Sequence, residues 1–66
     1  MNLTINGTLR QVAAEQNLSD LVNTFCKQSQ NVLTELNGVI VPRPQWSQTL
    51  LKDGDSLELV AFVGGG

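Results

Sequence analysis

The last apolar run of the chain, SLELVAFV at residues 56–63, is the feature that most limits the fold. Its apolar side chains alternate between two sides, with Leu57, Leu59, Ala61 and Val63 on one side and Val60 and Phe62 on the other. A strand that is apolar on both sides is typical of the middle of a sheet. The sequence therefore predicts that its last strand is a central one, and three glycines at positions 64–66 follow it directly.

A hairpin is predicted at the start of the chain, over LTINGTLRQVA at residues 3–13. Leu3 and Ile5 alternate with polar residues, as in a strand with one buried face. Asn6-Gly7 is a dipeptide that tolerates the positive φ of a tight turn. The second strand of this hairpin alternates less clearly.

One amphipathic helix is predicted next. Asn17 is suited to cap its first turn, and Asp20 lies near the positive end of the helix dipole. An apolar stripe at the spacing i, i+3, i+4 and i+7 is formed by Leu18, Leu21, Val22 and Phe25. We expect this helix to end near Ser29.

The segment NVLTELNGVIVP, residues 31–42, predicts another strand and a second tight turn. The turn is expected at Asn37-Gly38, for the same reason as at the first Asn-Gly dipeptide. A short apolar run follows and stops at Pro42, because proline lacks the amide that a strand ladder needs.

Short irregular elements connect this unit to the last strand. RPQWSQ at residues 43–48 indicates a single helical turn with Pro44 at its first position, and KDGD at residues 52–55 indicates a turn. Since one helix stripe and one sheet face must bury each other, the order of elements predicts an α+β fold of the β-grasp type, with about four or five strands in a mixed sheet on one helix. We expect residues 1–63 to form this domain and residues 64–66 a flexible glycine tail.

Composition narrows the function of this chain of 66 residues. A chain this short forms at most one domain and leaves little room for a catalytic cleft. The absence of histidine removes the commonest metal ligand and general base, and the single cysteine excludes an intramolecular disulfide and a four-thiolate metal site. We therefore expect neither a metal site nor catalytic residues of its own.

Charge and hydropathy indicate the compartment and the kind of partner. A net charge of −2 and a pI of about 4.6 argue against nucleic acid and against an anionic membrane surface as partners. No apolar run approaches membrane-spanning length, and the first residues lack the features of a secretory signal. We expect a cytoplasmic protein that binds a basic protein partner.

The segment NGVIVPRPQW followed by LKDGDSLELVAFVGGG resembles the ThiS family, the sulfur carriers of thiamine biosynthesis among the ubiquitin-like β-grasp proteins. In that family a VPR segment precedes a tryptophan, and a DGD-type turn, a hydrophobic strand and terminal Gly-Gly follow. The matching residues in the first motif are Val41, Pro42, Arg43 and Trp46. The resemblance covers effectively the whole chain. Pro44, where many members are charged or polar, and the third glycine, Gly64, are its departures.

The resemblance implies a carrier that is a co-substrate and not an enzyme. An E1-like adenylating enzyme of the ThiF type would join the Gly66 carboxylate to the α-phosphate of ATP, which that partner binds and consumes. Sulfur from cysteine, passed on by a cysteine desulfurase and a persulfide relay, would displace AMP and leave a thiocarboxylate. A thiazole synthase of the ThiG type would take that sulfur. Gly64 and Gly65 would thread into the partner's pocket, and the chain itself, a monomer, would bind no cofactor.

Four residues are candidate partner contacts: Arg43, Trp46, Glu58 and Phe62. For Trp46 a packing role is the favoured alternative, although a large aromatic residue on a short loop also suits an interface. The acidic Glu58 could steer the domain toward a basic groove.

Two further features have a structural and a chemical interpretation. Cys26 lies on or beside the apolar helix face, where cysteine packs as a small hydrophobe, and a persulfide or a transient link to a partner is the alternative. Asp53 and Asp55 could suggest a metal loop, but the spacing of a calcium loop is absent and a turn is favoured.

Three functions remain open at this level. A carrier for thiazole synthesis is favoured by the VPRPQW segment. A molybdopterin-type sulfur carrier would share the chemistry of the tail. A conjugated ubiquitin-like modifier, or a protein-binding module with an inert tail, would belong to a different class.

Overall fold

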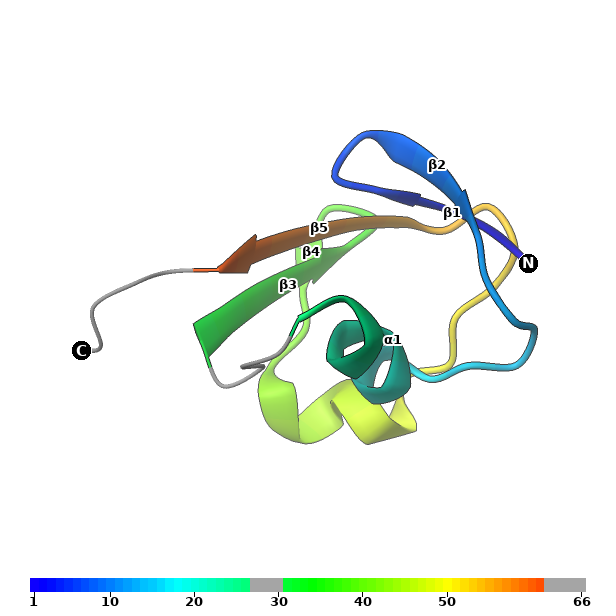
Figure 1. The fold of residues 1–66 in the computed structure, drawn as a ribbon. Coiled ribbons are helices and arrows are strands. Elements are labelled where there is room, and N and C mark those ends of the chain that lie inside the picture. Colours follow the sequence, from blue (N-terminus) through cyan, green and yellow to red (C-terminus); the bar gives the residue numbers. More distant parts are fainter. Residues whose placement is uncertain (27–30, 62–66) are drawn as a thin grey trace.

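The computed structural model describes residues 1–26 and 31–61 as one sheet with helices on one of its faces (Figure 1). The elements in chain order are β1 (Asn2–Ile5), β2 (Thr8–Gln11), α1 (Leu18–Phe25), β3 (Val32–Leu36), β4 (Val39–Ile40), the 3-10 helix η2 (Arg43–Gln48) and β5 (Ser56–Ala61). The five strands are arranged in the order β2-β1-β5-β3-β4. This arrangement confirms the predicted β-grasp class. No helix in the described part of the chain is long and apolar enough to cross a membrane.

Strand β5 lies at the centre of the sheet, as its sequence predicts. It runs parallel to β1, with which it pairs at two positions, and antiparallel to β3, with which it pairs from Leu57 to Ala61. Leu57 faces the helix and is fully buried, whereas Val60 on the opposite side is 50% exposed. The second apolar side of this strand is therefore not part of the core.

The two predicted Asn-Gly turns are confirmed, and their asparagine side chains hold β5. Asn6 and Asn37 both have a φ of 51°. Asn6 Nδ2 donates to the Leu59 carbonyl oxygen (3.1 Å), and the Leu59 N–H donates to Asn6 Oδ1 (2.7 Å). The Ser56 N–H donates to Asn37 Oδ1 (2.9 Å). Asn6 thus holds the edge of β5 that faces β1, and Asn37 holds the edge that faces β3.

Helix α1 begins as predicted but ends earlier. Asn17 Oδ1 accepts a hydrogen bond from the Asp20 N–H at 2.8 Å, which caps the first turn. The helix ends at Phe25, because Cys26 has extended angles of φ −130° and ψ 125°. The prediction of an end near Ser29 is therefore wrong, and Ser29 itself lies outside the described residues. The sequence KQSQ after Cys26 has no apolar side chain whose burial would favour another turn.

The core lies between α1 and the sheet. Its completely buried leucine and valine side chains are Leu3, Leu18, Leu21, Val22 and Leu57. Each leucine buried in this way contributes about 1.5–3 kcal/mol. Phe25, predicted to complete the helix stripe, is instead 39% exposed at the last helical position, and the Arg10 guanidinium lies 5.4 Å from the centre of its ring.

The KDGD turn is confirmed, and Asp55 is its structural centre. Gly54 has a φ of 90°, which suits glycine. The Asp55 carboxylate is buried and accepts hydrogen bonds from Asn37 Nδ2 (3.0 Å) and from the Lys52 N–H (2.8 Å). It therefore ties the start of β5 to the turn between β3 and β4.

We expect Asp55→Ala to lower the free energy of unfolding by about 1–3 kcal/mol, because it leaves two partly buried donors without a partner. Asp53→Ala is the matched control, since it removes one exposed hydrogen bond from the Asn2 N–H. Urea unfolding measures both variants. Equal losses in the two variants would contradict the central role of Asp55.

Candidate functional site

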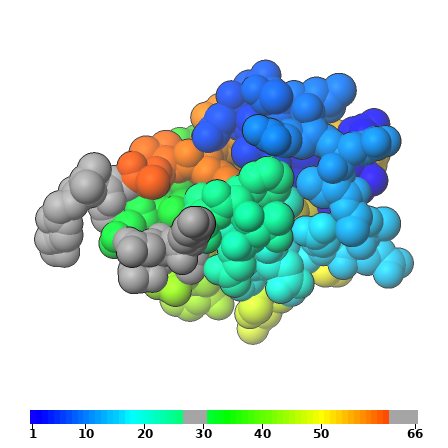
Figure 2. Space-filling model, viewed as in Figure 1, coloured from blue at the N-terminus to red at the C-terminus, as the bar shows by residue number. Residues whose placement is uncertain are grey.

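The strand that leads to the glycine terminus is held from both sides. The predicted site residues Phe62, Gly64, Gly65 and Gly66 lie outside the described residues. The structure does place the strand before them: β5 is paired with β3 as far as Ala61. The end of β5 reaches the molecular surface beside β3, with the β1–β2 hairpin on its other flank (Figure 2).

The sheet face opposite α1 carries a group of exposed and half-buried residues along β3, β4 and β5. We call it the open-face patch: Leu33, Glu35, Ile40, Glu58 and Val60. Leu33 and Val60 are directly opposite each other on β3 and β5 and are 41% and 50% exposed. Ile40, opposite Glu35 on β4, is 54% exposed. The patch is therefore a mixture of apolar and acidic surface.

Two carboxylates face each other within the open-face patch. Glu35 and Glu58 are a directly opposed pair on β3 and β5, and like charges in this arrangement destabilise a sheet. Neither carboxylate has a hydrogen bond or an ion pair in the described part of the chain. A cationic side chain of a partner would relieve this repulsion, so the pair is suited to bind one. The structure thus places Glu58 on an exposed surface that a partner could reach.

Trp46 belongs to the core, as the packing alternative proposes. It is 3% exposed, and its indole Nε1–H donates to the Val41 carbonyl oxygen at 2.9 Å. Pro42 precedes the first residue of η2, so Pro44 is at the second position of that helix and not at the predicted first. Arg43 is exposed, and its guanidinium lies 5.9 Å from the centre of the Trp46 ring. Trp46 therefore offers very little surface to a partner, whereas Arg43 remains accessible.

Cys26 and the aspartates of the KDGD turn have structural surroundings. Cys26 is a free, partly buried cysteine that packs against the core. Asp55 is occupied by the hydrogen bonds described above, and no group of three metal-binding side chains occurs among residues 1–26 and 31–61.

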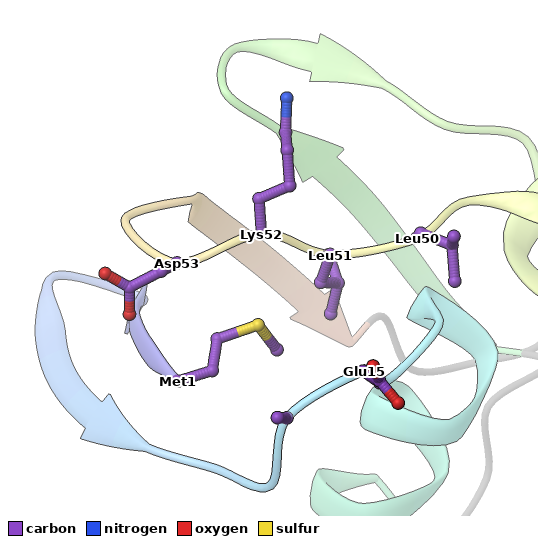
Figure 3. Close-up of a pocket in the computed structure, with 7 residues that line it drawn as sticks. Met1, Glu15, Leu50, Leu51, Lys52 and Asp53 are labelled. Atoms are coloured by element: carbon purple, nitrogen blue, oxygen red, sulfur yellow. The ribbon is translucent and has the colours of Figure 1, made fainter.

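A hollow of about 770 Å³ lies at the other end of β5 (Figure 3). The side chains of Met1 and Leu51 point into it, and those of Lys52 and Asp53 point away. The lining segment from Leu50 to Asp53 precedes β5 in the chain, whereas the glycines follow it. The hollow is therefore not part of the site at the C-terminal end of the strand.

Sequence reasoning missed part of the open-face patch. It selected Glu58 but not Leu33, Glu35 or Ile40. The alternation of VLTEL was a usable signal, because it places Leu33 and Glu35 on the side opposite the buried Val32 and Thr34. Which residue of β5 stands opposite each of them depends on register, and the local sequence does not specify it.

The geometry defines the class of protein. A mixed five-stranded sheet under one α-helix, with a central strand that precedes a glycine terminus, is a ubiquitin-like β-grasp domain. The chain belongs to the ThiS family, whose model matches residues 3–66.

Similar proteins agree with this family. The chain is 32% identical to the sulfur carrier protein ThiS of Escherichia coli (strain K12), with complete coverage of both chains. It is 41% identical to a thiazole synthase of Paramagnetospirillum magneticum, of which it spans only 20% of the length. The crystal structure of the thiamine biosynthesis protein (ThiS) from Geobacter metallireducens superposes with a TM-score of 0.86 at 39% identity, again with complete coverage of both chains. The resemblance read from the sequence is thereby confirmed.

We expect Trp46→Phe to lower the free energy of unfolding by about 1–3 kcal/mol, because it removes the hydrogen bond to Val41 and leaves a small cavity. The same variant should bind partners like the wild type at temperatures where it is folded. Urea unfolding followed by circular dichroism measures the first effect. An unchanged unfolding midpoint would contradict the packing role.

Proposed function

We propose that this chain is the sulfur carrier protein of thiazole synthesis, the step of thiamine formation that needs a sulfur donor. The observation that carries the proposal is a central strand, held at both edges, that precedes a glycine terminus in a member of the ThiS family. The similar proteins are a sulfur carrier and a thiazole synthase, and these functions favour thiazole over molybdopterin as the destination of the sulfur.

The Gly66 carboxylate needs activation before it can accept sulfur. Its negative charge is delocalised over two oxygens and repels a nucleophile. Joining one oxygen to the α-phosphate of ATP releases pyrophosphate and creates an acyl-adenylate. The outer sulfur of a persulfide then adds to the acyl carbon and AMP leaves, which gives an acyl disulfide. A thiol attacks the donor's sulfur atom in that acyl disulfide, so the S–S bond breaks, the thiocarboxylate leaves, and the thiol and the donor are left joined as a disulfide. The activating enzyme is of the E1-like ThiF type, and a cysteine desulfurase with a persulfide relay supplies the sulfur.

In the proposed reaction this chain positions the reacting carboxylate and performs none of the chemical steps. Among its described residues no nucleophile or metal-binding group is arranged for chemistry, and the sequence has no phosphate-binding GxxxxGK[ST] loop. Gly64 and Gly65 have no side chain to obstruct a narrow pocket. The paired strand β5 fixes the point from which the glycines extend. The carrier is thus acted on by other enzymes.

A thiazole synthase of the ThiG type is the proposed acceptor of the sulfur. The support is the Paramagnetospirillum magneticum protein, in which a region similar to the whole of this chain is part of a longer thiazole synthase. Two domains joined in one chain meet at a high effective concentration. Joining two domains in one chain is useful when one domain must pass a reactive group to the other.

The open-face patch is the proposed docking surface for the adenylating enzyme. Its apolar residues suit the core of an interface, and the Glu35–Glu58 pair suits a basic side chain of the enzyme. The patch and the proposed reactive terminus are joined by β5, so docking would bring the terminus to the active site. Arg43, at the start of η2, and Phe62, outside the described residues, remain proposed partner contacts.

We expect the chain to gain mass when it is incubated with ATP, a ThiF-type enzyme, a cysteine desulfurase and cysteine. The gain should equal the replacement of one oxygen by sulfur, and fragmentation should locate it at Gly66. Deletion of Gly65 and Gly66 together, which leaves one terminal glycine, should abolish it and leave the unfolding midpoint nearly unchanged, because glycine has no side chain to bury. Intact-mass spectrometry measures the gain.

The control for this experiment is Escherichia coli ThiS with the same enzymes. A mass gain in that carrier but not in this chain would overturn the proposal and favour a binding module with an inert tail. Complementation of a strain without its own carrier, on medium without thiamine, tests thiazole as the destination. Growth supported by the variant without Gly65 and Gly66 would contradict the assignment.

We expect Glu58→Gln to raise the KM for the carrier in the adenylation assay about twofold to fivefold, because it removes one charge from the docking surface. The same change should slightly raise the free energy of unfolding, since it ends the repulsion with Glu35. Glu15→Gln is the matched control, because it removes the same charge from an exposed residue outside the patch. An equal rise in KM for the two variants would show that only net charge matters.

A further inference from the structure

Asn6 extends the pairing between β1 and β5 by means of its side chain. The backbones of β1 and β5 pair only at Ser56 and Leu57 of β5. The Asn6 carboxamide then donates to the Leu59 carbonyl oxygen (3.1 Å) and accepts from the Leu59 N–H (2.7 Å). A carboxamide that binds both groups of one residue reproduces the hydrogen bonds of a strand neighbour. The ladder thus continues past the point where the chain turns at Asn6-Gly7.

The two asparagine turns hold opposite ends of β5. Because β1 is parallel to β5, the Asn6 turn lies toward the C-terminal end of β5, the end that precedes the glycines (Figure 1). Because β3 is antiparallel to β5, the Asn37 turn lies at the beginning of β5, beside Ser56. Both asparagines have the same φ of 51° and are followed by glycine. Asn37 is therefore a matched control for any effect of a substitution at Asn6.

We propose that Asn6 is a positioning residue for the reaction at the C-terminal carboxylate, an inference that rests on the proposed function. Past Leu59, no other described strand flanks β5 on its β1 side. The carboxamide therefore sets the point from which that edge of the strand is free. The carboxylate must meet a phosphorus atom in line within a pocket built by another protein, and a small displacement lowers the fraction of complexes in reactive geometry.

Kinetics separate this role from a contribution to stability alone. A less stable carrier has fewer folded molecules at a given concentration, which raises the apparent KM but leaves kcat at saturation unchanged. A loosened end of β5 leaves docking through the open-face patch intact and makes the bound terminus less often reactive. That effect lowers kcat and leaves KM nearly unchanged.

The experiment compares Asn6→Gly with Asn37→Gly in the adenylation reaction, measured as pyrophosphate release by a ThiF-type enzyme. Glycine keeps the positive φ of the turn and removes only the carboxamide. We expect Asn6→Gly to lower kcat about threefold to tenfold, the range for the loss of a hydrogen bond or two, with KM nearly unchanged. Asn37→Gly should leave kcat at the wild-type value. Asn6→Asp keeps the acceptor for the Leu59 N–H but not the donor, so its kcat should be intermediate.

A second measurement needs no enzyme. Amide hydrogen exchange in the isolated carrier, followed by NMR, should be faster at Leu59 in Asn6→Gly and unchanged there in Asn37→Gly. An unchanged kcat in Asn6→Gly, or an equal loss of kcat in both glycine variants, would overturn the positioning role. Failure of the wild-type chain to be adenylated would instead overturn the proposed function, and the positioning role with it. Unchanged exchange at Leu59 in Asn6→Gly would show that the Asn6 carboxamide does not hold β5 at Leu59, and would overturn the positioning role.

Discussion

The structure depends on the pairing of β5 on both of its edges. Its parallel partner, β1, comes from the first residues of the chain, and its antiparallel partner, β3, comes from the middle. A parallel neighbour requires a crossover between the two strands, and here the crossover includes α1, which packs on one face and contributes its buried stripe to the core. The fold is therefore completed only when the last strand inserts between strands that are distant in sequence.

Coverage by helices on one face leaves the other face of the sheet available. Among the described residues α1 is the one α-helix, and its buried stripe covers one side of the sheet. The apolar residues Leu33 and Val60 on the other side are exposed, although their burial in a core would have stabilised the domain. The opposed Glu35 and Glu58 add repulsion to that side. Both features weaken the isolated domain, and both acquire a favourable role when a partner with apolar and basic groups covers the face.

The sequence predicted the elements whose signals are local. The Asn-Gly turns, the cap at Asn17 and the central position of the last strand follow from dipeptide chemistry, side-chain capping and a run of apolar residues. The end of the helix was misplaced, because polar residues after Cys26 neither forbid nor favour another turn strongly. The hydrogen bonds from Asn6 to Leu59 and the pairing of Glu35 with Glu58 were not predictable, since both depend on which distant strands become neighbours. For the candidate site, the sequence alone proposed the glycines and Glu58, and the structure added the surface around Glu58.

The proposed function requires a rigid strand that leads to a C-terminal end without side chains, and these two requirements oppose each other along β5. Rigidity comes from neighbours that occupy both edges of the backbone, whereas entry into a narrow pocket requires that no neighbour and no side chain be present. Pairing with β3 reaches Ala61, but the described pairing on the β1 side ends at Leu59, where a side chain and not a strand makes the last hydrogen bonds. A carboxamide can end a strand ladder in little space, because it bonds the N–H and the carbonyl oxygen of one residue and offers no further backbone groups. On that edge the described hydrogen bonds of β5 therefore end with the side chain of Asn6, and in the proposed function this position sets how much of the end of β5 another protein can reach.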